Sequence, residues 1–309
     1  MSVVLTGNFD GVHIGHADLV HAAKKMADLR GEPLYIYTFN NNPKNFLDPA
    51  HAVASVMSLS DRDRLLYDLG ADRIVSVDFD KAFADMTADE YLDMLVSKLD
   101  CTCVVCGENF CFGRGGLCNA HNIGLYASAH GLAHTVVPLT RLPDGRAVSS
   151  TAVRRSVADA DMGTACAMLG RYFYMKGRVV HGRHEGTSFG YPTINIAPDI
   201  SLAVPGRGVY ETVTVVGGCL WRSMTNIGTA PTVSSSGRTM AETNLLCAAD
   251  GSDVGDLNAY GCPATVSFVR YLRPETRFSG VDELVAQLAR DRASVLASDA
   301  PNYDKVVRF

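Results

Sequence analysis

The chain has 309 residues, 47% of them hydrophobic and 20% charged, which is typical of a globular protein of about two domains. Its formal net charge of -5 and its pI of about 6.0 give no electrostatic case for binding nucleic acid or an anionic membrane surface. No apolar run has the length of a membrane span, no signal peptide is evident, and the nine cysteines are scattered and odd in number. These features predict a cytoplasmic protein with reduced thiols.

Hydrophobic periodicity predicts alternating strands and helices over the first half of the chain. The predicted strands are Val3–Leu5, Leu34–Phe39, Ile74–Val77, Thr102–Cys106 and Thr135–Val137. Helical spacing predicts a first helix that begins near His16 and ends before Gly31. Further helices are expected after capping boxes at Ser60 and Thr87 and over Ile123–His130. This alternation is typical of a parallel sheet covered on both faces, with ligands at the carboxyl ends of its strands.

The second half of the chain has a different rhythm, which begins after a predicted helical segment at Thr151–Leu169. Short strand-like runs follow at Gly177–Val180, Val209–Val216, Leu220–Asn226, Glu242–Leu246 and Ala264–Arg270. Glycine turns separate several of them, a pattern typical of an antiparallel barrel or sandwich, and a last helix is expected from about Val281 to Leu296. The sequence therefore predicts an α/β domain over residues 1–170 and a β-barrel domain with a terminal helix over residues 171–309.

Two histidines follow the first predicted strand within a glycine-bearing turn. The pattern G-x-F-D-G-x-H-x-G-H is formed by Gly7, Phe9, Asp10, Gly11, His13, Gly15 and His16. A strand, a glycine turn and a helix start present free backbone N–H groups and the positive end of a helix dipole, which suit phosphate. Imidazoles at positions i and i+3 can lie on one side of that opening and donate hydrogen bonds to further phosphate oxygens.

This string resembles the HxGH signature of the nucleotidyltransferase superfamily, and its FDG-containing form resembles the FMN adenylyltransferase module of bacterial FAD synthetases. Two later segments resemble motifs of that family in the same order. Gly107–Gly113 is similar to its G-E-x-F-x-F-G segment, which implies that Asn109 contacts nucleotide or flavin phosphate. Val148–Arg154 is similar to its S-S-T-x-x-R motif, in which a triphosphate would meet the side chains of Ser149, Ser150, Thr151 and Arg154.

The resemblance implies a Rossmann-like N-terminal domain that transfers AMP from ATP to FMN, giving FAD and pyrophosphate without a protein nucleophile. Positioning and charge stabilisation would come from His13, His16, Arg154, the helix dipole and Mg²⁺. The residues implied in cofactor binding are Gly7, Phe9, Asp10, Gly11, Gly15, Asn109, Ser149, Ser150 and Thr151. Two places depart from the family: Asn40–Asn42 stands within the segment that usually reads F-D-P-H-P, and Cys118 stands where glycine is usual.

A second motif opens the β-rich half. Gly177–Asn195 resembles the riboflavin kinase module and ends in its P-T-x-N; backbone could approach phosphate at Gly182, Gly186 and Gly190. The Thr193 hydroxyl and the Asn195 carbonyl are hard oxygen ligands of the kind that Mg²⁺ accepts. Asn226 opens a segment similar to the family's N-I-G-x-x-P-T and is expected to bind cofactor.

Glu242 aligns with the glutamate assigned as the catalytic base in that family, where a carboxylate accepts the proton of the ribityl 5′-hydroxyl. This half departs from the family at Asn244, where histidine is common, and at Gly255–Gly261, where residues are added. The main prediction is a bifunctional enzyme that uses riboflavin, FMN, FAD and ATP with Mg²⁺. No nucleic-acid or membrane partner is expected, and the oligomeric state is not predicted.

Three alternatives stay open. A cysteine-rich stretch invites a zinc site, although its spacing lacks the paired knuckles of structural sites: Cys101, Cys103, Cys106, Cys111 and Cys118, with His121. The Asn40–Asn42 departure keeps open a monofunctional riboflavin kinase with a vestigial front domain. The third alternative is a non-catalytic flavin-binding regulatory or carrier protein.

Overall fold

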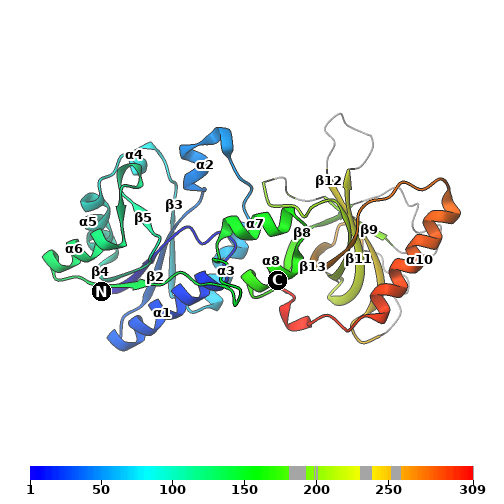
Figure 1. The fold of residues 1–309 in the computed structure, drawn as a ribbon. Coiled ribbons are helices and arrows are strands. Elements are labelled where there is room, and N and C mark those ends of the chain that lie inside the picture. The colour runs from blue at the N-terminus through cyan, green and yellow to red at the C-terminus, as the bar shows by residue number, and fades with distance from the viewer. Residues whose placement is uncertain (181–192, 198, 200, 230–238, 252–258, 309) are drawn as a thin grey trace. The chain divides into compact units, whose positions relative to one another are not determined.

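A computed structural model describes residues 1–180, 193–197, 199, 201–229, 239–251 and 259–308. The chain forms two compact units, Met1–Ser150 and Thr151–Phe309, each with its own sheet (Figure 1). The unit boundary precedes the helical segment that the sequence analysis assigns to the N-terminal domain. The division at residues 170 and 171 stays a prediction.

The N-terminal unit is built on a five-stranded parallel sheet with the order β3-β2-β1-β4-β7. Its strands are β1 (Ser2–Thr6), β2 (Leu34–Phe39), β3 (Arg73–Val77), β4 (Cys101–Gly107) and β7 (Ala133–Val137). The order reverses at β1, which has β2 on one side and β4 on the other. The predicted parallel sheet is confirmed, and the carboxyl end of β1 lies at the switch point where ligands bind in such sheets.

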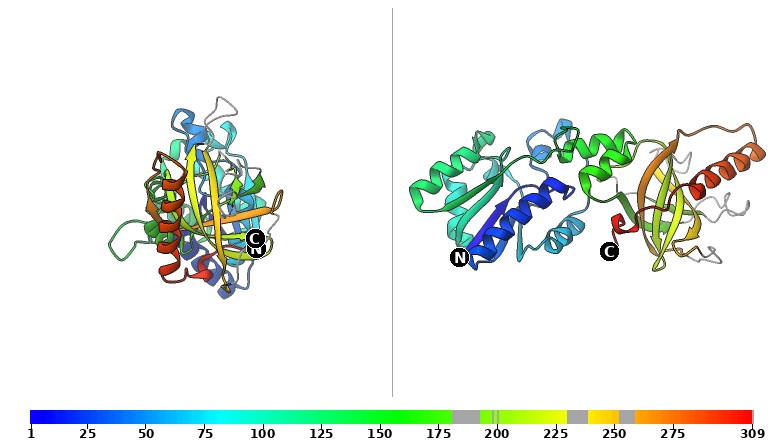
Figure 2. Two further views of the ribbon diagram at one scale, coloured as in Figure 1. Left: turned by 90° about the vertical axis from the view of Figure 1, so that its right-hand side faces the viewer. Right: turned by 60° about the horizontal axis from the view of Figure 1, so that its bottom comes forward.

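Helices cover both faces of this sheet. They are α1 (Ile14–Arg30), α3 (Leu59–Asp68), α5 (Ala88–Leu99) and α6 (Ala120–His130), with the short α2 (Pro43–Leu47) and α4 (Lys81–Ala84) and a ribbon of β5 (Cys111–Phe112) and β6 (Cys118–Asn119). The side chains of Val4 and Val104 form a core with α5 and α6. Helix α1 lies along the opposite face of the sheet (Figure 2). The phosphate-suited turn between β1 and α1 therefore has a rigid base.

One of the two predicted capping boxes is confirmed. The Thr87 hydroxyl accepts the Glu90 N–H, and the Glu90 carboxylate accepts the Thr87 N–H. The box expected at Ser60 is wrong, because Ser58 is the N-cap of α3 and its hydroxyl accepts the N–H of Asp61. Ser58 has the extended backbone that an N-cap needs, whereas Ser60 is already helical.

The C-terminal unit contains a closed antiparallel barrel with the strand order β10-β11-β12-β9-β8-β13. Its strands are β8 (Phe173–Val180), β9 (Thr193–Ile196), β10 (Gly208–Val216), β11 (Cys219–Thr229), β12 (Thr239–Ala248) and β13 (Pro263–Arg273). The predicted barrel is confirmed and the sandwich is not. Strand β9 was not predicted, because only four residues form it. The last helix, α10 (Val281–Ala297), lies against the barrel.

The helical segment predicted over Thr151–Leu169 is two helices, α7 (Ser150–Ala158) and α8 (Met162–Leu169). Ala160 interrupts it with a φ of 61°, and the Asp161 carboxylate then caps α8 by accepting the N–H of Thr164. A left-handed backbone at alanine is not readable from apolar spacing, so the prediction of one segment is corrected here.

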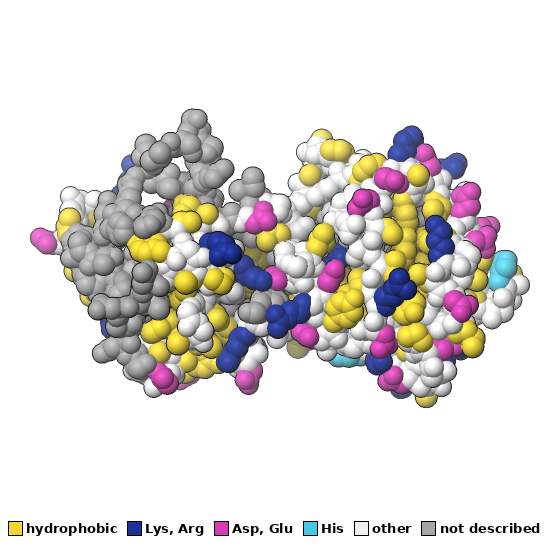
Figure 3. Space-filling view, turned by 180° about the vertical axis from the view of Figure 1, so that it is seen from behind, with side chains coloured by type: hydrophobic (Ala, Val, Ile, Leu, Met, Phe, Trp, Pro, Cys, Tyr) yellow, Lys and Arg dark blue, Asp and Glu magenta, His cyan; other side chains and the backbone are white. Residues whose placement is uncertain are grey.

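Among the described residues, no helix is both long enough and apolar enough to cross a bilayer. On the face shown in Figure 3, basic and acidic side chains are interspersed within each unit.

Burial divides the described cysteines by their expected reactivity. Burial raises the pKa of Cys101 to about 12 and that of Cys106 to about 11, so both stay thiols at neutral pH. Cys111 and Cys219 are exposed. We expect Ellman's reagent to modify these two thiols first in the native protein, and the buried ones only after denaturation. The Cys111→Ser/Cys219→Ser variant should lack the fast phase of absorbance, and a fast phase that persists in it would contradict the assigned burial.

Candidate active sites

The turn between β1 and α1 has an unusual backbone. Phe9, Gly11 and Val12 have φ values of 54°, 86° and 35°. Positive φ is costly for a β-branched residue such as Val12, and backbone strain of this kind clusters at functional sites. Gly7 is required locally, because a Cβ there would lie 2.9 Å from the Phe9 ring. The turn is therefore closely packed and held in one conformation.

The two predicted imidazoles lie together at the start of α1. His13 is the N-cap and is 6% exposed, and its Nδ1 accepts the backbone N–H of His16 at 3.2 Å. The His13 and His16 rings stack with centroids 3.6 Å apart and planes 15° apart. Because Nδ1 of His13 is an acceptor, a neutral His13 carries its proton on Nε2, where it is a hydrogen-bond donor. Phe9 packs edge-on against His16 at 5.2 Å.

Asp10 connects this turn to two other segments. Its Oδ1 accepts the N–H of Val56 at 2.8 Å, and its backbone oxygen accepts the hydroxyl of Ser150 at 2.8 Å. Asp10 is 7% exposed. The structure thus brings one hydroxyl of the S-S-T-x-x-R segment to the G-x-F-D-G-x-H-x-G-H turn, although the two are about 140 residues apart.

The other predicted residues of this site lie in the loop after β4 and around the start of α7. Asn109 is exposed in the loop after β4, and its Oδ1 lies 3.2 Å from the place where a Cβ on Gly107 would stand. Ser149 precedes α7, Thr151 lies in its first turn and Arg154 one turn further along. Hydroxyls at a helix start therefore match the sequence-based expectation.

The Asn40–Asn42 departure has a structural explanation. Asn41 donates to the backbone oxygen of Phe79 at 2.9 Å and accepts its N–H at 2.7 Å, as a strand neighbour would. Asn40 donates to Asp78 at 2.8 Å, and Asn42 caps α2 by accepting the N–H of Lys44. Asn40 and Asn41 therefore tie the end of β2 to the segment after β3. For the Cys118 departure, the structure places that residue in β6, opposite Phe112.

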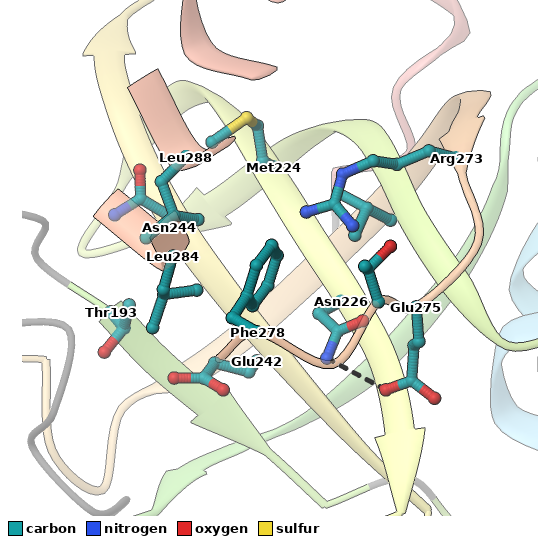
Figure 4. Close-up of a pocket in the computed structure, with 12 residues that line it drawn as sticks. Thr193, Met224, Asn226, Glu242, Asn244, Arg273, Glu275, Phe278, Leu284 and Leu288 are labelled. Atoms are coloured by element: carbon teal, nitrogen blue, oxygen red, sulfur yellow. Dashed lines mark hydrogen bonds between the residues drawn. The ribbon is translucent and has the colours of Figure 1, made fainter. Parts of the chain in front are cut away.

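In the C-terminal unit, strand register brings the predicted kinase residues together. Asn226 on β11 pairs with Glu242 on β12, and Glu242 pairs with Asn195 on β9. Thr193 pairs with Asn244, two residues along β12. Directly paired residues share a face, with Cβ atoms about 5 Å apart. Residues from three strands thus form one polar group, and Thr193 and Glu242 lie side by side (Figure 4).

This polar group borders a cavity of about 210 Å³. Its polar lining residues are Thr193, Asn226, Glu242, Asn244, Arg273, Glu275 and Thr276. Its apolar lining residues are Val209, Met224, Phe278, Leu284 and Leu288, and Figure 4 shows several of them among the polar ones. Apolar side chains with convergent polar groups are the usual lining of a small-molecule site, and a flat ring bearing a polar chain suits it.

Asn226 is held by a second carboxylate of the cavity. Its Nδ2 donates to Glu275 at 3.3 Å, while among the described residues its buried Oδ1 has no hydrogen-bond partner. Gly228 permits this arrangement, because a Cβ there would lie 2.1 Å from a Glu275 oxygen. A buried acceptor without a partner is costly, so Oδ1 is suited to a ligand group or an ion.

Helix α10 is a wall of this cavity, and two ion-pair groups fix it. Arg273 donates to both carboxylate oxygens of Asp291 over 2.8 to 3.1 Å. Arg222 donates to the buried Glu211 at 3.0 Å and to the backbone oxygen of Val295 at 2.5 Å. Breaking a buried pair of this kind costs about 3 to 5 kcal/mol. Both groups therefore keep the second half of α10 against the barrel, next to the turns that carry Leu284 and Leu288.

Sequence reasoning missed part of this site. Leu284 and Leu288 were recognised only as an apolar helix face, and Arg273, Glu275 and Phe278 were not singled out. For Leu284 and Leu288 the available signal was their i, i+4 spacing. For Arg273, Glu275 and Phe278 it was the R-P-E-T-R-F stretch before α10. The predicted phosphate-binding glycines, Gly182, Gly186 and Gly190, lie outside the described residues.

No group of three or more His, Cys, Asp or Glu side chains within the described ranges has the arrangement of a metal site. Cys101 and Cys106 pack into the hydrophobic core of the N-terminal unit. In contrast, the oxygens of Thr193, Asn195, Asn226 and Glu242 are of the hard type that Mg²⁺ accepts, so the second site fits that ion.

Comparisons with known proteins match both units. The FAD synthetase family model matches residues 1–152, and the riboflavin kinase family model matches residues 169–298. The bifunctional riboflavin kinase/FMN adenylyltransferase of Escherichia coli strain K12 is 34% identical over 94% of this chain and 90% of its own. The chain belongs to this family.

A further relative of the same description supports this assignment, and one solved structure is similar over nearly the whole chain. The enzyme of the same description from Pseudomonas fluorescens is 32% identical over 97% of this chain and 94% of its own. The crystal structure of a macrolide-efflux protein from Streptococcus pneumoniae is 28% identical, with a TM-score of 0.87 over 96% of this chain and 94% of that chain. The family resemblance stated from the motifs is thus confirmed.

Proposed function

We propose that this chain phosphorylates riboflavin to FMN at the Thr193–Glu242 cavity and transfers AMP from ATP to FMN at the His13–His16 turn. The observation that carries the proposal is that each family model falls on the unit whose described residues hold the corresponding site. We assign the first activity to residues 171–309 and the second to residues 1–170. The substrates are riboflavin, FMN and ATP, and FAD is the final product.

In the kinase site, Glu242 acts as the general base for the ribityl 5′-hydroxyl. The apolar wall of Phe278, Leu284 and Leu288 suits the flavin ring, which would point the ribityl chain toward Glu242. Thr193 and Asn195 would hold Mg²⁺, which when bound would neutralise charge on the ATP phosphates. The orphaned Oδ1 of Asn226 supports a ligand or ion at the same place.

In the adenylyltransferase site, the phosphate of FMN attacks the α-phosphorus of ATP in line and pyrophosphate leaves. The Nε2–H groups of His13 and His16 donate to the phosphate oxygens as charge develops on them. The start of α1 adds its dipole, and Ser149, Thr151 and Arg154 bind the triphosphate. This chemistry needs positioning and charge stabilisation rather than a protein nucleophile.

One incubation separates this proposal from its alternatives. The chain is mixed with riboflavin, ATP and MgCl₂, and the flavins are resolved by chromatography. FAD supports the bifunctional enzyme, FMN alone supports a kinase with a vestigial front domain, and neither product supports a carrier protein. Excess EDTA should abolish both products and added MgCl₂ should restore them, since both reactions use ATP with its metal ion.

We further propose a cytoplasmic location and no nucleic-acid or membrane partner. The formal net charge of -5 and the interspersed charges on the face shown in Figure 3 support this proposal. The same preparation tests it by electrophoretic mobility shift with random DNA and RNA, in which no shift is expected at physiological salt.

A further inference from the structure

A threonine outside every recognised motif contacts the turn that carries the two histidines. Thr140 follows β7, and its hydroxyl donates to the carboxylate of Asp18 on α1 at 2.5 Å. Thr140 Oγ1 also lies 3.3 Å from the place where a Cβ on Gly15 would stand, and Nδ1 of His13 lies at the same distance. Any larger residue at position 15 would therefore press on both Thr140 and His13. The glycine of H-x-G-H lets the Thr140 hydroxyl dock on the first turn of α1.

The backbone of Thr140 extends this contact to the hydroxyl motif. Its carbonyl oxygen accepts the N–H of Val148 at 3.0 Å, which closes the base of the hairpin formed by residues 140–148. Arg141 and Ala147 form the next bridge along this hairpin. Ser149 and Ser150 leave directly from its base, so the place of Thr140 determines where they begin.

Two chain segments are thereby joined at both of their ends. Asp10 and Asp18 bound the first segment, which contains both histidines. Thr140 and Ser150 are the ends of the second segment. The Thr140 hydroxyl donates to Asp18, and the Ser150 hydroxyl donates to Asp10. A closed ring of bonds limits how far either segment can shift relative to the other, whereas a single bond would leave a hinge.

We propose that Thr140 is a positioning residue for adenylyl transfer, which clamps the hairpin of residues 140–148 to α1 and so holds the Ser149–Ser150 hydroxyls beside the imidazoles. This inference rests on the function proposed for the N-terminal unit. Thr140 acts through Asp18 and Val148 and touches no reacting atom. Displacement of binding groups by a fraction of an ångström weakens ATP binding and in-line geometry together.

The activity test compares Thr140→Val, which removes the hydroxyl at equal size, with Thr140→Ser, which keeps it. We expect Thr140→Val to lower kcat/KM for ATP in FAD formation by about 5- to 10-fold, the factor that one hydrogen bond is worth. Thr140→Ser should stay within about twofold of the wild type on the same reasoning. Riboflavin phosphorylation by the same samples should not change, which controls for protein concentration and folding.

A double-mutant cycle tests whether Thr140 acts through Asp18. Asp18→Ala should lose as much activity as Thr140→Val, and the double variant should lose no more than either single variant. Losses that multiply in the double variant would overturn the clamp. A kcat/KM for ATP in the Thr140→Val variant equal to that of the wild type would also overturn the clamp.

Limited proteolysis tests the clamp without any activity. The hairpin contains Arg141 and Arg146, both exposed, so trypsin cleavage there reports how often it opens. Cleavage should be several-fold faster in Thr140→Val and Asp18→Ala than in the wild type and Thr140→Ser. Equal cleavage in all four proteins would overturn the clamp. Absence of FAD formation by the wild type would instead overturn the proposed function, and cleavage would still decide on the clamp.

Discussion

FAD formation from FMN and ATP is expected to fall by about 10²- to 10³-fold when His13 or His16 is replaced by alanine, which is the usual effect of removing one preorganised donor. The two rings stack with centroids 3.6 Å apart at the start of α1. In the proposed function, each supplies an N–H to the phosphate oxygens on which charge develops. Riboflavin phosphorylation should be unchanged in both variants, because that chemistry is assigned to the other unit. Initial rates with FMN and with riboflavin as separate substrates measure the two activities.

His13→Ala also removes the side-chain cap of α1, so a second variant is needed to separate loss of the cap from loss of the imidazole donor. His13 caps α1, and loss of a side-chain cap costs about 1 kcal/mol of stability. Asparagine is a good N-cap that lacks the imidazole Nε2–H. His13→Asn should therefore keep the thermal stability of the wild type and still lose FAD formation. Undiminished FAD formation by a His13→Ala/His16→Ala variant would refute the assigned roles.

Riboflavin phosphorylation is expected to fall by about 10³-fold in Glu242→Gln, within the range that general-base catalysis supplies. Glutamine keeps the size of the side chain but does not accept the proton of the ribityl hydroxyl. KM for riboflavin should stay near the wild-type value, because the apolar wall of the cavity is intact. FMN supplied directly should still be converted to FAD, which shows that the N-terminal unit is folded.

Glu275 is the matched control for Glu242. It is the other carboxylate on the described lining of the cavity, and it accepts a hydrogen bond from Asn226. Glu275→Gln should retain most of kcat, since the amide still accepts a hydrogen bond from Asn226. Near-normal phosphorylation in Glu242→Gln together with loss in Glu275→Gln would mean that Glu275 is the base.

Local signals predicted single elements well. The bounds of β2 and the capping box at Thr87 agree with the structure, because a short run of buried residues and a reciprocal cap depend on neighbours in sequence. The predictions of a cap at Ser60 and of one unbroken helical segment through Ala160 were wrong for a related reason. Several Ser and Asp residues near a helix start all satisfy the pattern, and a left-handed alanine is stabilised by its surroundings.

The sequence by itself determined the chemistry: which imidazoles, hydroxyls and carboxylates the chain carries, in motifs short enough to be recognised along one segment. His13 and His16 lie side by side because a helix turn dictates it. Tertiary structure alone decided which distant residues join them. Register across three strands brought Thr193, Asn226 and Glu242 to one cavity, α10 closed it, and Thr140 reached α1 across more than a hundred residues of chain. Such contacts depend on packing between elements, which no local pattern encodes.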